Sequence, residues 1–232
     1  MPKAIKKRTS RKAVDTETEV TERLATFKDT LRERQKTAIQ IAAGALVILI
    51  AITGFFLYSS SVKKKAGEYE FQAYKIFNST TRMQPGNKGG QYKKALDMFQ
   101  KAYDTKKSPV SLFYIAACYY ELGNYDETVK TLKDFTRKYS GAERLAPLAH
   151  QKMAMAYVRK GDVNEALKTL DTLYSLPGDI FKDVALMETG KLLERQGKSD
   201  EAKKKYEELT KKFPDSPFRD EAEARLAGKK KG

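Results

Sequence analysis

The pattern of apolar and polar positions divides the chain into one uninterrupted apolar segment and a long series of amphipathic helices. Residues 37 to 58 contain no charged side chain. At about 1.5 Å per residue, a helix of this length is roughly 33 Å long, enough to cross a hydrocarbon core of about 30 Å. The pattern therefore predicts a transmembrane helix at residues 37–58.

The length and position of this segment disfavour its removal. It is longer than the apolar region of a signal peptide, it starts late, and Ser59-Ser60-Ser61 follows it in place of a small-x-small cleavage site. No cysteine stands at its end to accept a lipid. We expect the helix itself to be the anchor.

Two further segments precede the apolar one. Val20, Leu24, Phe27 and Leu31 recur at intervals of 4, 3 and 4, which places them on one helical face. Residues 20–36 are therefore expected to form an amphipathic juxtamembrane helix that lies on the lipid surface or packs against a partner. Residues 1–19 are dense in charge without apolar periodicity, which predicts a disordered basic head that can contact anionic lipid.

After the apolar segment, a glycine followed by a small residue five positions later recurs every 33 to 38 residues. Such a glycine ends one helix with a positive φ, and the small residue lets the next helix pack closely. The matches are Gly90-x-Tyr92-x-x-Ala95, Gly123-x-Tyr125-x-x-Thr128, Gly161-x-Val163-x-x-Ala166 and Gly197-x-Ser199-x-x-Ala202. The pattern predicts a series of helical hairpins.

Other local signals complete the expected solenoid. Asn124 and Asp162 each precede a glutamate by three residues, as in a capping box. A turn-rich insertion separates the first helix from Gln91, and a last helix is expected to begin at about Phe218. We predict an all-α fold in which residues 66–227 form about four hairpins plus a capping helix, followed by a basic tail at residues 228–232.

These features resemble the tetratricopeptide repeat family, whose units of about 34 residues end one helix and start the next in this way. The family's early tryptophan is missing. The matching residues are Ala116, Tyr119, Gly123 and Tyr125, then Ala154, Tyr157, Gly161 and Ala166, then Gly190, Gly197, Ala202, Tyr206 and Pro214.

The whole layout is similar to the YfgM-like ancillary subunits of the Sec translocon, while the phrase PDSPFRDEA also resembles periplasmic proteins of the YbgF and BamD type. The resemblance implies a bacterial inner-membrane protein with periplasmic repeats. It also implies that the repeats contact the translocon, chaperones or envelope-assembly proteins.

The formal net charge is +15, and the basic residues on the two sides of the apolar segment bear on its orientation. A short head with an excess of Lys and Arg tends to stay in the cytoplasm, which would place the repeats outside it. Lys63, Lys64 and Lys65 follow the apolar segment and oppose this assignment. An organelle import receptor with cytosolic repeats is therefore the alternative.

Residues that could support catalysis or metal binding are scarce. Cys118 and His150 are the only residues of their types, and Gly197-Lys198-Ser199 lacks the glycine of a phosphate-binding loop because Leu192 occupies that position. We therefore predict no enzyme activity, metal or cofactor. Charge alone permits nucleic-acid contact, but no aromatic residues interleave the basic ones of the head, so protein partners are favoured.

In tetratricopeptide arrays the first helix of each hairpin lines the concave face. Positions there that are free of packing would form a groove rich in apolar and Met side chains, suited to an extended or helical protein segment. Packing between repeats is the competing role for the same positions. The predicted groove residues are Val110, Phe113, Ala117, Tyr120, Leu148, Gln151, Met155, Val158, Val184, Met187 and Lys191.

Overall fold

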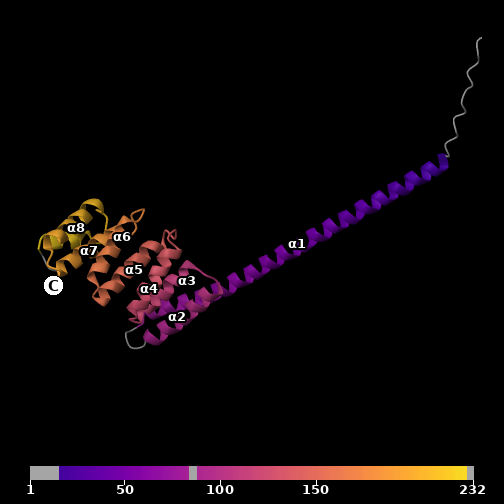
Figure 1. Cartoon of the computed structure of the whole chain (residues 1–232). Helices are drawn as coiled ribbons and strands as arrows, with labels where there is room; N and C mark the ends of the chain where they lie inside the picture. Colours follow the sequence, from indigo (N-terminus) through magenta and orange to yellow (C-terminus); the bar gives the residue numbers. More distant parts are fainter. Residues whose placement is uncertain (1–15, 84–87, 229–232) are drawn as a thin grey trace, which may run out of the picture. The chain divides into compact units, whose positions relative to one another are not determined.

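The structure is a computed structural model that describes residues 16–83 and 88–228. Most of the predicted basic head, the centre of the predicted insertion and most of the predicted basic tail lie outside these ranges. Contacts divide the chain between Ser60 and Ser61 into two units. The predicted all-α class is confirmed, because the described residues form helices and no strand (Figure 1).

The first helix, α1 (Thr16–Thr81), is a single element in which the predicted amphipathic and apolar segments follow one another without a break. No proline interrupts it, and neither the polar residues before the apolar segment nor those after it include a residue that stops a helix. Residues 20 to 58 are exposed throughout. By length and composition, α1 is the one described helix that could cross a membrane.

The described residues of the second unit form the end of α1 and eight further helices. They succeed one another as antiparallel neighbours, shown in Figure 1 from magenta to yellow. Their bounds are α2 (Lys88–Thr105), α3 (Pro109–Glu121), α4 (Tyr125–Lys138), α5 (Leu145–Lys160), α6 (Val163–Ser175), α7 (Lys182–Arg195), α8 (Ser199–Lys212) and α9 (Arg219–Leu226). The last of these begins where the sequence predicts.

Three hydrophobic clusters hold the described part of this unit together. One joins the end of α1 to α2 and α3 around Ala73 and Phe99, where Phe99 stacks on Tyr114 with ring centroids 5.0 Å apart. The largest runs from α3 to α7 around Leu132 and Phe135, and the third joins α7, α8 and α9. Since each cluster involves neighbouring helices, every hairpin buries its apolar face against the next.

The predicted glycine turns hold at three of four positions. Gly123, Gly161 and Gly197 have positive φ values of 78°, 86° and 75°, respectively, and each lies between the helices of a hairpin. Gly90 is different because α2 already begins at Lys88, which places Gly90 inside the first turn of that helix. The prediction that Gly90 ends a helix is therefore wrong.

The predicted capping boxes lie at helix starts, but the predicted side-chain hydrogen bonds do not form. Asn124 and Asp162 occupy the N-cap positions of α4 and α6, but neither side chain makes a capping hydrogen bond. Ser108 does cap α3, since its Oγ accepts a hydrogen bond of 3.4 Å from the Ser111 backbone N–H. The sequence signals therefore locate these helix starts without describing how each is stabilised.

A candidate protein-binding groove

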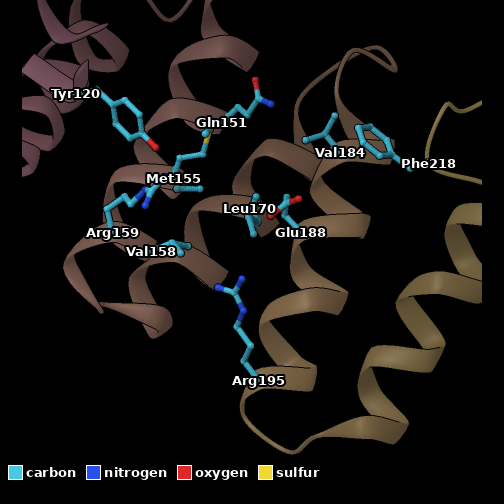
Figure 2. A pocket seen from close by; sticks show the side chains of 11 residues that line it. Tyr120, Gln151, Met155, Val158, Arg159, Leu170, Val184, Glu188, Arg195 and Phe218 are labelled. Atoms are coloured by element: carbon cyan, nitrogen blue, oxygen red, sulfur yellow. The ribbon is translucent and has the colours of Figure 1, made fainter. Parts of the chain in front are cut away.

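A hollow of about 600 Å³ lies along one side of the second unit, between the first helices of successive hairpins. Figure 2 shows side chains from α3, α5 and α7 around it, together with Leu170 of α6 and Phe218 from the connection before α9. The helices α3 and α5 contact each other directly, so alternate helices share this face. We call this hollow the groove; its lining residues are Tyr120, Gln151, Ala154, Met155, Val158, Arg159, Leu170, Val184, Glu188, Arg195 and Phe218.

The inner wall of the groove is apolar. Ala154, Leu170 and Val184 are buried, because they also belong to the cores between hairpins. The side chain of Met155 is 42% exposed and points into the open space. A flexible thioether at the centre of an apolar surface can adapt to partner side chains of different shapes.

The edges of the groove carry polar and charged groups. A hydrogen bond with the Tyr120 hydroxyl raises the pKa of the Arg159 guanidinium above its usual value. On the opposite helix, Glu188 Oε1 accepts a hydrogen bond of 3.2 Å from Lys191 Nζ, while Arg195 is exposed one turn beyond the apolar wall. The groove therefore offers an apolar surface bounded by two guanidinium groups and one carboxylate.

Lysine and tyrosine also meet on the α3–α5 side. Lys152 Nζ lies 4.7 Å from the centroid of the Tyr120 ring, a cation–π distance. Burial lowers the pKa of Lys152, although the nearby carboxylate of Glu121 opposes that effect. Tyr120 is therefore contacted by Lys152 at its ring and by Arg159 at its hydroxyl.

Five of the predicted groove residues line the observed groove. They are Tyr120, Gln151, Met155, Val158 and Val184. All five lie on first helices of hairpins, which is the rule from which they were predicted.

Six predicted residues lie elsewhere. Phe113, Ala117 and Met187 are buried in the cores between helices, where Phe113 packs against Phe135 with ring centroids 6.3 Å apart. Each first helix has neighbours on two sides, so only a narrow stripe of it remains open, and these three positions fall outside that stripe. Val110, Leu148 and Lys191 are partly buried and do not line the groove.

Six lining residues were missed. Arg159 lies four positions after Met155, and Glu188 lies four positions after Val184, so extending the helical stripe by one turn would have found both. Ala154 and Arg195 also belong to first helices. Leu170 and Phe218 come from a second helix and a connection, and no sequence signal marks them.

Outside the groove, the titratable groups of residues 16–83 and 88–228 form no metal-binding cluster. The described residues contain no group of three or more His, Cys, Asp or Glu side chains that could hold a metal ion. Burial raises the pKa of the Cys118 thiol to about 12, so this cysteine stays protonated and unreactive at neutral pH. His150 is half-buried. Within the described residues, its buried Nδ1 has no hydrogen-bond partner.

Comparison with solved structures supports the repeat fold. The TPR-like repeats of a putative kinesin light chain from Podosopora anserina align with a TM-score of 0.53 at 16% identity, covering 72% of this chain and 86% of that one. MamA aligns with a TM-score of 0.50 at 17% identity, covering 70% of this chain and 90% of that one. At such identities the likeness concerns the fold alone.

The search of curated proteins finds no match. The profile of the tetratricopeptide repeat-like domain, in contrast, matches residues 35–227. This range begins just before the apolar segment and ends with α9, so it covers most of the chain. The protein therefore belongs to the tetratricopeptide repeat-like family.

Proposed function

We propose that this protein is a membrane-anchored scaffold whose groove binds extended segments of partner proteins. In this proposal residues 37–58 cross the bacterial inner membrane, the N-terminus is cytoplasmic, and the repeats act in the periplasm during secretion or envelope assembly. Translocon components, chaperones and envelope-assembly proteins are the proposed partner classes. The observation that carries the proposal is the open apolar wall shared by α3, α5 and α7.

The properties of the groove favour a peptide segment as its occupant. A concave surface with an apolar wall and a few polar groups at its edges suits a chain that inserts apolar side chains and orients its polar atoms at the rim. Met155 supplies adaptable contact, which suits a scaffold that meets more than one sequence.

Two observations support the proposed anchor. Residues 20 to 58 are exposed throughout their own unit, so the apolar segment buries none of its side chains there. The match to the family profile includes this segment together with the repeats, which supports a common role for the two in this family. Exposure of an apolar surface of this size to water is unfavourable, and the hydrocarbon core of a bilayer removes that surface from water.

Site-specific crosslinking tests the groove. A photoreactive amino acid replaces Met155 or Val184 in the groove, and Asp171, an exposed residue on α6, serves as the matched control. We expect both groove positions to crosslink the same proteins in native membranes and the control position to give none of them. Equal crosslinking from Asp171 would contradict binding in the groove.

Protease protection tests the topology and separates the main proposal from the import-receptor alternative. The connection between α6 and α7 contains Gly178 at a φ of 77° and several exposed residues, which makes it a suitable cleavage site. Protease added outside spheroplasts should cut there if the repeats are periplasmic. Cleavage only after lysis would instead place the repeats in the cytosol and contradict the periplasmic assignment.

A further inference from the structure

A group of lysines from distant parts of the sequence meets at the start of the second unit. Lys63 lies on α1, while Lys106 and Lys107 lie on the connection between α2 and α3. All three line one shallow cavity of about 240 Å³, together with Ala66, Gly67, Glu70 and the first residues of α3. More than forty residues of sequence separate Lys63 from Lys106, so only the fold brings them together.

Most of this positive charge has no carboxylate partner within the described residues. Lys107 Nζ lies 3.1 Å from Asp104 Oδ1, but that carboxylate is itself 77% exposed. Lys63 and Lys106 make no ion pair in the described part of the chain. Glu70 is already engaged, since its Oε1 accepts hydrogen bonds from Ser108 Oγ at 3.1 Å and Ser111 Oγ at 2.7 Å.

Chain connectivity alone keeps this group near the end of the apolar segment. Only five residues lead from Tyr58 to Lys63, and five residues of chain span at most about 18 Å in any conformation. Head groups and interface add roughly 5 to 8 Å on each side of the hydrocarbon core. If residues 37–58 cross the bilayer, Lys63 and the two lysines beside it therefore lie within reach of lipid phosphates.

We propose that Lys63, Lys106 and Lys107 form a lipid-contact surface that binds anionic phospholipid head groups of the leaflet on the repeat side. The proposal rests on the membrane anchor proposed above. Lysine ammonium groups bind phosphates without demanding a fixed geometry, and basic residues beside a span bind anionic lipid additively. The surface also gives Lys63 a role in lipid contact, which explains why basic residues follow the span on the side opposite the basic head.

The experiment uses the full chain in lipid nanodiscs with a reporter in the cavity. Gly67→Cys provides the label position, because a Cβ at Gly67 meets no atom within 4 Å and no charge is removed. Cys118 is buried and its raised pKa keeps it out of the labelling reaction. A fluorophore at residue 67 is read against phospholipids that carry a quencher on the head group.

Nanodiscs of phosphatidylglycerol mixed with phosphatidylcholine are compared with nanodiscs of phosphatidylcholine alone. We expect stronger quenching in the anionic discs, and its loss in about 0.5 M NaCl, where screening is short-ranged. The double substitution Lys106→Glu with Lys107→Glu should lower the affinity for anionic head groups by at least about tenfold. Each basic residue near an anionic surface raises that affinity about fivefold.

The matched control is Lys203→Glu with Lys204→Glu on α8, which changes the net charge equally at two exposed lysines of the last hairpin. This variant should keep the quenching of the parent protein. Equal quenching in anionic and neutral discs, or an equal effect of both double variants, would overturn the lipid-contact surface. Failure of the full chain to enter nanodiscs would instead contradict the proposed anchor. Failure of the anchor and failure of the lipid-contact surface are therefore distinguishable.

Discussion

Two regions of the same helix use apolar side chains in opposite ways. Between residues 37 and 58, side chains such as Phe55 are exposed, at 68% in that case. Near the end of α1, Ala66 and Ala73 are buried, and Phe77 packs against Tyr92 with ring centroids 5.4 Å apart. The residue types are similar, so the difference lies in what surrounds them.

This difference shows why hydrophobicity alone does not assign a role. In the repeats, apolar groups leave water by packing against the next hairpin, which stabilises the fold. Residues 37–58 are exposed and are long and apolar enough to cross a bilayer, so the same driving force favours a lipid environment for them. Substitutions at matched residue types in the two regions should therefore affect different properties.

The largest expected effect concerns membrane retention. Ile48→Arg combined with Leu49→Arg places two charges at the centre of the apolar segment, each costing about 2.5 to 3.5 kcal/mol on insertion. Most of the protein should then become extractable by alkaline carbonate. Phe71→Arg, at a position 70% exposed but outside the segment, should leave extraction unchanged. Equal behaviour of the two variants would contradict the comparison.

The next effect concerns the stability of the repeats. Phe135 is fully buried between α4 and its neighbours, so Phe135→Ala should lower the free energy of unfolding by about 3 to 5 kcal/mol. Phe55→Ala removes the same side chain from an exposed position and should change it by less than about 0.5 kcal/mol. Thermal unfolding of the full chain in detergent, followed by circular dichroism, measures both. A large loss for Phe55→Ala would mean that protein covers the apolar segment.

Two glycines give a smaller and opposite pair of effects. A Cβ on Gly190 would lie 2.7 Å from Cζ of Tyr206, whose ring is buried and cannot withdraw. Gly190→Ala should therefore destabilise the repeats by about 1 to 3 kcal/mol. Gly67→Ala has open space around it and should stabilise α1 by up to about 1 kcal/mol. The same unfolding measurement reports both effects. Destabilisation by Gly67→Ala would contradict the open space around residue 67.

The smallest effect concerns pH. Burial lowers the pKa of His150, and its Nδ1 has no hydrogen-bond partner in the described protein. Below about pH 6.5 the unfolded chain binds a proton that folded His150 resists, so stability should fall between pH 7 and pH 5. The pKa values of Asp134, Glu208 and Glu221 are also lowered, and their contribution to stability is lost only as the pH falls toward the usual pKa of a carboxyl group. His150→Gln should flatten this slope in unfolding scans, and an unchanged slope would exclude His150 as its cause.

Local signals in the sequence predict much of the fold. Gly123, Gly161 and Gly197 are predicted as turns because a helix that ends in the left-handed region favours glycine there, and that preference is local. Gly90 misled because its neighbours continue the helix on both sides, so the same residue pattern stands within an element. The continuity of α1 could also be anticipated, since no helix-breaking residue separates its segments.

The groove could be predicted only in part, since it depends on how hairpins stack. Helical spacing places Gln151, Met155 and Val158 on one face of α5, whatever the neighbours do. Burial of Phe113 and Met187, and the approach of Phe218 to the same space, depend on the angles between hairpins. These angles arise from many side-chain contacts, which a single local pattern does not contain.

The most direct test of the central claim is the environment of the apolar segment itself. A spin label at Leu49→Cys, in full-length protein reconstituted into liposomes, is compared with one at Phe71→Cys; both native side chains are exposed. If residues 37–58 cross the bilayer, the label at residue 49 collides with oxygen but is shielded from a water-soluble nickel complex, whereas the label at residue 71 remains accessible to nickel. Equal nickel accessibility at the two positions would contradict a membrane-spanning anchor.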